Sequence, residues 1–222
     1  MIKIDQLIRS RRKTIALIVQ LDGRLAVRAP LRATKRQILD FVERKSAWIR
    51  SKQELALKSS SITKPKEYVS GESFWFLGQT YRLQIVENAG QLLSLNHCFC
   101  LDRDALPQAQ KVFIQWYRQQ ARRVISERLA WYASRYGYSY RQIKITSART
   151  RWGSCSSKRT ISFTWRLVMA PLPVIDYVVV HELAHTSVKN HDKAFWSKVK
   201  AILPGYPQQA AWLKTNGALL FL

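Results

Sequence analysis

Acidic residues are scarce in this chain of 222 residues, which holds 14 of them against 37 lysines and arginines, for a net charge of +23. The shortage is greatest after residue 104, where four acids face 18 basic residues. So few carboxylates argue against the acidic clusters that hold Mg²⁺ and nucleotides. The positive charge instead predicts affinity for polyanions such as nucleic acid or nucleotides.

Long apolar runs and paired cysteines are also absent. No segment approaches the ~20 apolar residues that a membrane span needs, and the basic N-terminus lacks the apolar core of a secretory signal. Three cysteines, at positions 98, 100 and 155, show neither CxxC spacing nor a disulfide framework. These absences predict a cytoplasmic protein with no membrane partner.

Histidine is rare as well, yet three of the four histidines fall within eleven residues, at His181, His185 and His191. The first two belong to an HExxH pattern, which places them on one face of a helix because residues i and i+4 are neighbours there. Two such imidazoles bind one metal ion, and Glu182 lies where it reaches a water on that metal. Three protein nitrogens with one open position predict catalytic Zn²⁺.

The third histidine requires a turn in the chain. A continuous helix would carry His191 about 9 Å along the axis beyond His185, out of reach of a shared ion. The helix is therefore expected to end before His191, with Asn190 adopting the left-handed conformation that terminates helices. Asp192 is expected to cap the next helix.

The residue pattern predicts an α+β protein. Residues 1–104 are expected to be β-rich with one helix, which starts at an N-cap on Thr34 and runs to about Leu57. A hairpin turn is expected at Asp22-Gly23 and a polar linker at Ser59–Pro65.

The pattern changes near Ala105, where a long helix begins and runs to Gly137. Residues 105–222 are then expected to pack the metal-binding helix on a small sheet. The change in pattern predicts two parts, 1–104 and 105–222. A single continuous domain that contains both parts is the alternative.

The chain resembles the YgjP-like metallopeptidase family, which is related to SprT-type and other HExxH zinc peptidases. The resemblance covers almost the whole chain and rests on Arg151–Ser157, Thr164–Leu167, Ala170-Pro171, Ile175–His185, Asn190-His191 and Phe195-Trp196, with a fainter N-terminal match at Arg11–Thr14 and Val27–Pro30. It implies a zincin-like C-terminal part and a zinc site at His181, His185 and His191. It also implies that Glu182 is the catalytic acid and base and that the substrate is a protein or peptide.

The expected reaction is hydrolysis by a zinc-bound water, with Glu182 as the base. A developing oxyanion needs a stabilising group, and three residues are candidates for substrate or oxyanion contacts by their chemistry alone: Arg149, Arg151 and Tyr206. Three arginines on the long helix are candidates for nucleic-acid contacts: Arg118, Arg122 and Arg123.

Two alternatives stay open at this point. A metal-dependent nucleotide phosphohydrolase would use the same site and the arginines, although the chain has no P-loop. A non-enzymatic nucleic-acid-binding protein would carry a structural zinc, which usually has a fourth ligand, and Cys155 is available for that position.

Overall fold

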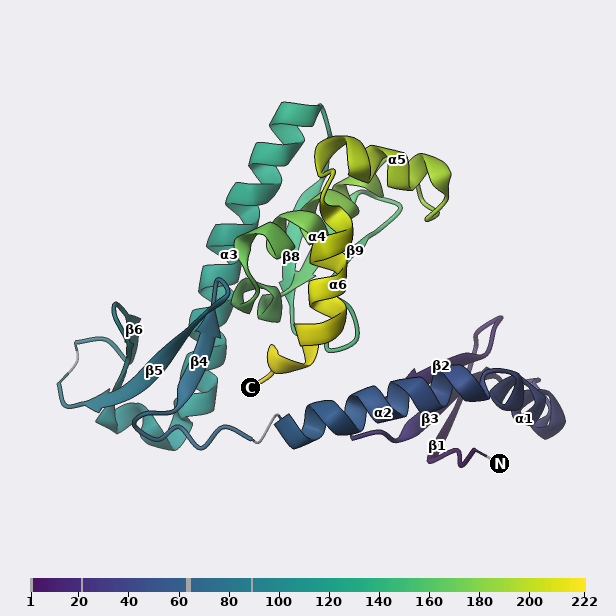
Figure 1. The fold of residues 1–222 in the computed structure, drawn as a ribbon, viewed down its shortest axis with the longest axis horizontal. Coiled ribbons are helices and arrows are strands. Elements are labelled where there is room, and N and C mark those ends of the chain that lie inside the picture. The colour runs from purple at the N-terminus through teal and green to yellow at the C-terminus, as the bar shows by residue number, and fades with distance from the viewer. Residues whose placement is uncertain (1, 21, 63–64, 89) are drawn as a thin grey trace. The chain divides into compact units, whose positions relative to one another are not determined.

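The structure, a computed structural model, describes residues 2–20, 22–62, 65–88 and 90–222, with the side chains at 55 and 57–62 outside the description. Helices and small sheets are both present (Figure 1), which confirms the predicted α+β class. The chain divides into two compact units, Met1–Pro65 and Lys66–Leu222.

The first unit is a three-stranded sheet covered by two helices. Its strands are β1 (Gln6–Ser10), β2 (Ala16–Val19) and β3 (Leu25–Pro30), in the order β1-β3-β2, with β1 parallel and β2 antiparallel to β3. Its small core consists of buried aliphatic residues from β3 and both helices: Leu25, Val27, Ala29, Ile38, Val42 and Ile49.

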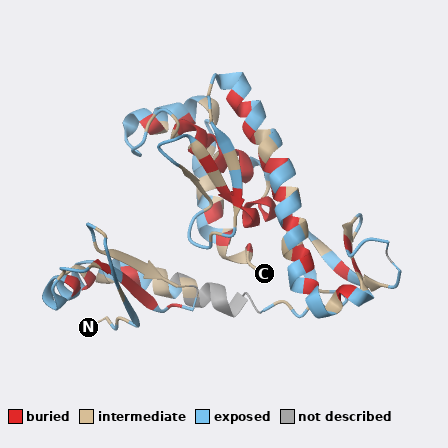
Figure 2. Cartoon of the chain, turned by 180° about the vertical axis from the view of Figure 1, so that it is seen from behind, coloured by how far each residue is buried: buried red, intermediate tan, exposed pale blue. Residues whose placement is uncertain are grey.

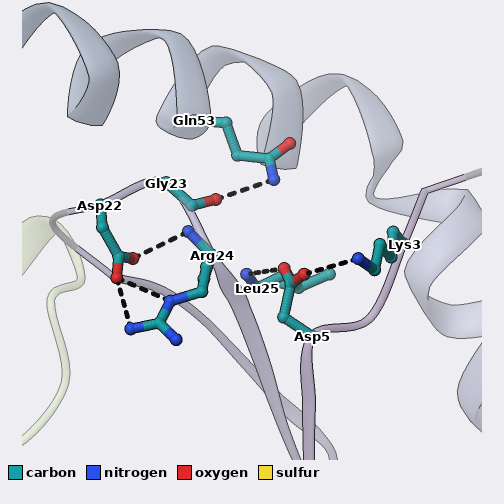
Figure 3. A network of polar contacts seen from close by, with 7 residues as sticks. All are labelled: Lys3, Asp5, Asp22, Gly23, Arg24, Leu25 and Gln53. Carbon is teal, nitrogen blue, oxygen red and sulfur yellow. Dashed lines mark hydrogen bonds and ion pairs between the residues drawn. The ribbon is translucent and has the colours of Figure 1, made fainter.

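Polar contacts hold the predicted turn at Asp22-Gly23 (Figure 3). The Asp22 carboxylate accepts hydrogen bonds from the backbone N–H and the guanidinium of Arg24, at 3.0 and 2.7 Å. Gln53 donates to the carbonyl of Gly23 at 2.9 Å. The turn is therefore fixed both locally and from the neighbouring helix.

The predicted helix after Thr34 is two helices, α1 (Lys35–Arg44) and α2 (Ser46–Ile62). Thr34 caps the first helix as expected. In return, the side-chain oxygen of Gln37 accepts a hydrogen bond from the Thr34 backbone N–H at 2.9 Å. The helix breaks at Lys45, and α2 continues into the expected linker. Residues 63–64 of that linker lie outside the described residues.

The second unit begins with a four-stranded sheet in the order β4-β5-β7-β6. Only the β5–β7 pair is parallel. Strand β7 was not expected from the sequence. The sheet presents aromatic rings to the long helix, with Phe74 stacked 4.3 Å from Phe113 between ring centroids. The strands are β4 (Ser73–Phe76), β5 (Gln79–Val86), β6 (Leu93–Leu95) and β7 (Phe99–Asp102).

Helix α3 (Ala109–Tyr136) connects this sheet to the rest of the unit. It follows a 3₁₀ helix (Arg103–Gln108) and ends at Gly137, whose φ of 68° is left-handed, as the glycine predicts. Figure 2 shows buried positions recurring along α3 between exposed ones. One continuous core runs from β4 through α3 to the C-terminal helices, so the pattern change near residue 105 lies inside a single packed unit.

The C-terminal part packs helices on a second small sheet, in the order β8-β10-β9. The elements are β8 (Gln142–Thr146), β9 (Gly153–Cys155), β10 (Thr160–Thr164), the 3₁₀ helices Trp165–Met169 and Gly217–Leu219, α4 (Leu172–Ala184), α5 (Lys193–Ile202) and α6 (Tyr206–Asn216). Helix α4 packs on α3, on β9 and on both later helices. Among the described residues, no helix has the length and apolar character needed to cross a bilayer.

An ion pair joins α3 to α4. Arg128 donates two hydrogen bonds to the carboxylate of Asp176, at 2.6 and 2.8 Å. Arg128 is half-buried, although it lies on the arginine-rich long helix, because it contacts the buried Asp176.

Candidate metal centre

Helix α4 carries two of the three clustered histidines. Its N-cap is Pro171, and the run from Val174 to Val180, which is apolar except for Asp176, keeps most of the helix buried. His181 lies in its last turn, and His185 follows as the C-cap. The two imidazoles therefore lie one turn apart on a helix that the core holds rigidly.

The chain turns after His185 and brings the third histidine back. The imidazole Nδ1 of His185 lies 3.0 Å from the carbonyl oxygen of Val188 inside this turn. Asp192 caps α5 by accepting a hydrogen bond from the Phe195 N–H at 3.0 Å, as expected. Asn190 does not adopt the left-handed conformation, so that expectation is wrong. Successive hydrogen-bonded turns at residues 186–188 end the helix instead.

The three histidines meet at their Nε2 atoms. The Nε2 of His191 lies 3.1 Å from that of His185 and 3.0 Å from that of His181. Tetrahedral ligands at about 2.0–2.1 Å from Zn²⁺ would lie about 3.4 Å from one another, so this spacing fits a coordination shell. Within the described part of the chain, these three residues form the one group whose ligand atoms all lie within 4.8 Å, and Cys155 is not in it.

The surroundings favour neutral imidazoles, the form that binds metal. Burial, followed by the charges of His185 and His191, lowers the pKa of His181 to about 4. Burial also lowers the pKa of His185, against the opposing effect of the Val188 carbonyl. The Nδ1 atom of His181 is buried without a hydrogen-bond partner. The neutral forms of His181 and His185 therefore leave lone pairs available for a cation.

Glu182 is buried beside this group. Burial raises the pKa of its carboxyl to about 7, although the charge of Arg151 acts to lower it. Its Oε2 atom is buried and has no hydrogen-bond partner. A buried carboxylate with a pKa near neutrality is suited to accept and release a proton.

Strand β9 supplies a glycine against which Glu182 packs. A Cβ atom on Gly153 would lie 2.5 Å from Oε1 and 2.6 Å from Cγ of Glu182. Only glycine allows this approach. The family resemblance included Arg151–Ser157, but the sequence did not indicate this contact, which joins residues 29 positions apart.

We expect Gly153→Ala to displace Glu182 and to cost about 1–3 kcal/mol of folding free energy, the usual cost of overpacking a core. Hydrolysis should fall more than metal content, because the histidines are untouched. Thermal unfolding, zinc content and rate would be measured together. Gly205→Ala is the matched control, since its Cβ would meet only the Gln209 side chain, at 3.9 Å. Equal activity in the two variants would contradict this contact's role.

A pocket of about 300 Å³ opens beside His181 and Glu182. Its other walls come from β9, from the loop before β9, and from α4 and α6. They are mostly apolar: Trp152, Gly153, Tyr177, Val178, Ala210 and Leu213. The pocket therefore has room for an apolar group directly next to the candidate metal and base.

The candidate substrate contacts lie in different surroundings. Arg151 is exposed, and its charge reaches Glu182. Tyr206 stacks between Trp196 and Tyr177, with ring centroids 5.2 and 6.2 Å away. Arg149 lies over the ring of Phe221, at 5.7 Å from its centroid. Their roles as substrate or oxyanion contacts stay predictions.

The candidate nucleic-acid contacts on α3 are all exposed. Arg118 donates to Ser147 and to the Ile145 carbonyl, at 2.9 and 3.3 Å. Arg123 pairs with Glu127 at 3.7 Å. Two of the three arginines are thus already engaged by the protein, and a nucleic-acid role remains a prediction.

Comparison with known proteins identifies the family. A family model described as "YgjP-like, metallopeptidase domain" matches residues 13–216. The chain belongs to this YgjP-like metallopeptidase family, which confirms the resemblance seen in the sequence. Membership implies a metal-dependent hydrolase that uses a divalent cation.

Two further comparisons add little. The crystal structure of the metallopeptidase zymogen of Pyrococcus abyssi abylysin is similar at 21% identity and a TM-score of 0.39, over 41% of this chain and 93% of that one. No curated protein sequence matches the chain.

Proposed function

We propose that the protein is a zinc-dependent peptidase in which His181, His185 and His191 hold the metal and Glu182 is the acid and base. One observation carries the proposal. Three imidazole nitrogens converge near a buried carboxylate that has an unpartnered oxygen, and His181 and Glu182 line a pocket of about 300 Å³. The YgjP-like metallopeptidase match supports the same reaction class.

When bound, Zn²⁺ supplies a Lewis acid that polarises the scissile carbonyl and makes a water more acidic. Glu182 takes a proton from the attacking water, because its burial raises the proton affinity of its carboxylate. The same carboxyl then donates a proton to the leaving amine. Gly153 positions Glu182, since no other residue leaves room for the side chain at that point.

The pocket beside Glu182 supports binding of an apolar substrate side chain. Tyr177, Trp152 and Leu213 form walls without charge, so a leucine or phenylalanine side chain would gain from leaving water. Arg151 is the favoured oxyanion contact of the three candidates, because its charge reaches Glu182. Tyr206 lies in the second layer of rings around His181.

The structural-zinc alternative lacks its fourth ligand among the described residues, because Cys155 does not join the three histidines. Burial also raises the pKa of the Cys155 thiol, which disfavours the thiolate that binds zinc. An intact Glu182 beside the cluster favours catalysis over a purely structural ion.

A hydrolysis panel tests the proposal and separates it from the phosphohydrolase alternative. We expect cleavage of peptides that place Leu or Phe in the pocket, weaker cleavage where Gly stands there, and no release of phosphate from nucleoside triphosphates. A chelator should abolish cleavage, and one equivalent of Zn²⁺ should restore it. Phosphate release without peptide cleavage would overturn the proposal.

A further inference from the structure

Three arginines gather around one short loop, at residues 147–149. Arg166 donates to the carbonyl of Ser147 at 3.2 Å, and Arg118 donates to the hydroxyl of the same residue at 2.9 Å. Arg149 follows two residues later, and its guanidinium and that of Arg166 both lie over the ring of Phe221, at 5.7 and 5.1 Å. Among the described residues, no carboxylate pairs with any of the three.

Arg166 is the most unusual member of this arginine cluster. Only 8% of its surface is exposed. Its guanidinium lies over two rings, with that of Trp165 at 4.3 Å. Its Nε atom is buried without a hydrogen-bond partner. Burial, followed by the charge of Arg149, lowers the pKa of Arg166 to about 10. A buried cation with an unused donor is costly unless an anion completes its surroundings.

The other partly buried arginine of this unit shows what Arg166 lacks. Arg128 has a carboxylate partner in Asp176, bound through two short hydrogen bonds. Arg166 is more deeply buried, yet among the described residues its hydrogen-bond acceptor is a backbone carbonyl. Within the described part of the chain, the fold therefore supplies a counter-ion for Arg128 and none for Arg166.

The cluster lies next to the substrate pocket. The ring of Phe221, over which two of the guanidinium groups lie, is 6.4 Å from the ring of Trp152 between centroids. Trp152 forms a wall of the pocket beside Glu182. The loop therefore links the two features: Arg118 and Arg166 contact Ser147 at its start, and Trp152 at its end lines the pocket.

We infer that Arg118, Arg149 and Arg166 form a binding site for a phosphoryl group, adjacent to the pocket of the candidate metal centre. A phosphoryl group carries a charge near −2 at neutral pH and has several acceptor oxygens, so it can satisfy more than one guanidinium. A carboxylate would neutralise only one of the three charges. Guanidinium groups also match the geometry of phosphate oxygens. This inference does not depend on the metal chemistry.

Inorganic phosphate is the probe, titrated into the whole protein at constant ionic strength and followed by calorimetry. We expect Arg149→Ala to weaken phosphate binding about tenfold, as expected for loss of one charge-assisted contact. Arg135→Ala is the matched control. It removes the same charge from an exposed arginine, which lies over Trp131, and it should bind phosphate like the wild type.

Arg166→Met extends the test to the buried member, with circular dichroism to verify folding. Acetate is titrated in parallel and should bind at least tenfold more weakly than phosphate. Equal loss in the Arg149 and Arg135 variants would mean that general positive charge attracts the anion, and would overturn the site. Equal binding of acetate and phosphate would identify a carboxylate site instead and overturn the phosphoryl assignment.

Discussion

Replacing Glu182 with glutamine is expected to lower peptide hydrolysis about a thousandfold and to leave the metal content unchanged. General acid–base catalysis contributes roughly 10²–10⁴ in rate, and an amide cannot take the proton of the attacking water. Glutamine has nearly the same shape as glutamate, so the contact with Gly153 and the position of the histidines should persist. The measurement is kcat on the best peptide of the panel, together with zinc content by elemental analysis.

Glu127→Gln is the control for this variant. Glu127 is an exposed acid on α3 that pairs with Arg123, so its loss changes the net charge equally without touching the site. It should retain the wild-type rate. Hydrolysis at the wild-type rate in the Glu182 variant would show that the proposed base is wrong, even if zinc is present.

Replacing His181 with alanine should remove both the metal and the activity. Two imidazoles would remain, and losing a direct ligand should weaken affinity by more than the roughly 10–100-fold seen when only an outer hydrogen-bond partner is lost. We expect about one zinc per chain in the wild type and almost none in the variant after dialysis. Elemental analysis and the peptide assay would be run on the same preparations.

His97→Ala is the matched control, because His97 is the one histidine outside the cluster and is exposed. It should keep both zinc and activity. Full zinc content in the His181 variant would rule out the three-histidine centre. Loss of zinc in both variants would mean that the metal is bound elsewhere.

Local rules were enough for much of the fold. Thr34 caps α1 and Asp192 caps α5 as predicted, because capping depends on a few neighbouring residues. The hairpin at Asp22-Gly23 and the end of α3 at Gly137 follow from turn chemistry in the same way. The short strands β7 and β9 were not predicted, because three or four residues are too few to show the alternating pattern of a strand.

The boundary between the compact units was harder to predict from the sequence. The residue pattern changes near Ala105 because a sheet gives way to a long helix. Packing does not change there, since α3 contacts elements on both sides of that point. The chain divides into its two compact units after Pro65, at the end of the stretch expected to be a linker.

The clustering of the three histidines and the position of Glu182 could be predicted from the sequence, because the 3.6-residue period of a helix and the need for a turn before His191 are local constraints. The residues that surround them depend on how distant elements pack. Gly153 meets Glu182 because β9 packs on α4. Among the described residues Arg166 has no counter-ion, because the core that buries it supplies no acid as a partner. Such contacts join residues far apart in the chain, and no local pattern encodes which of them will meet.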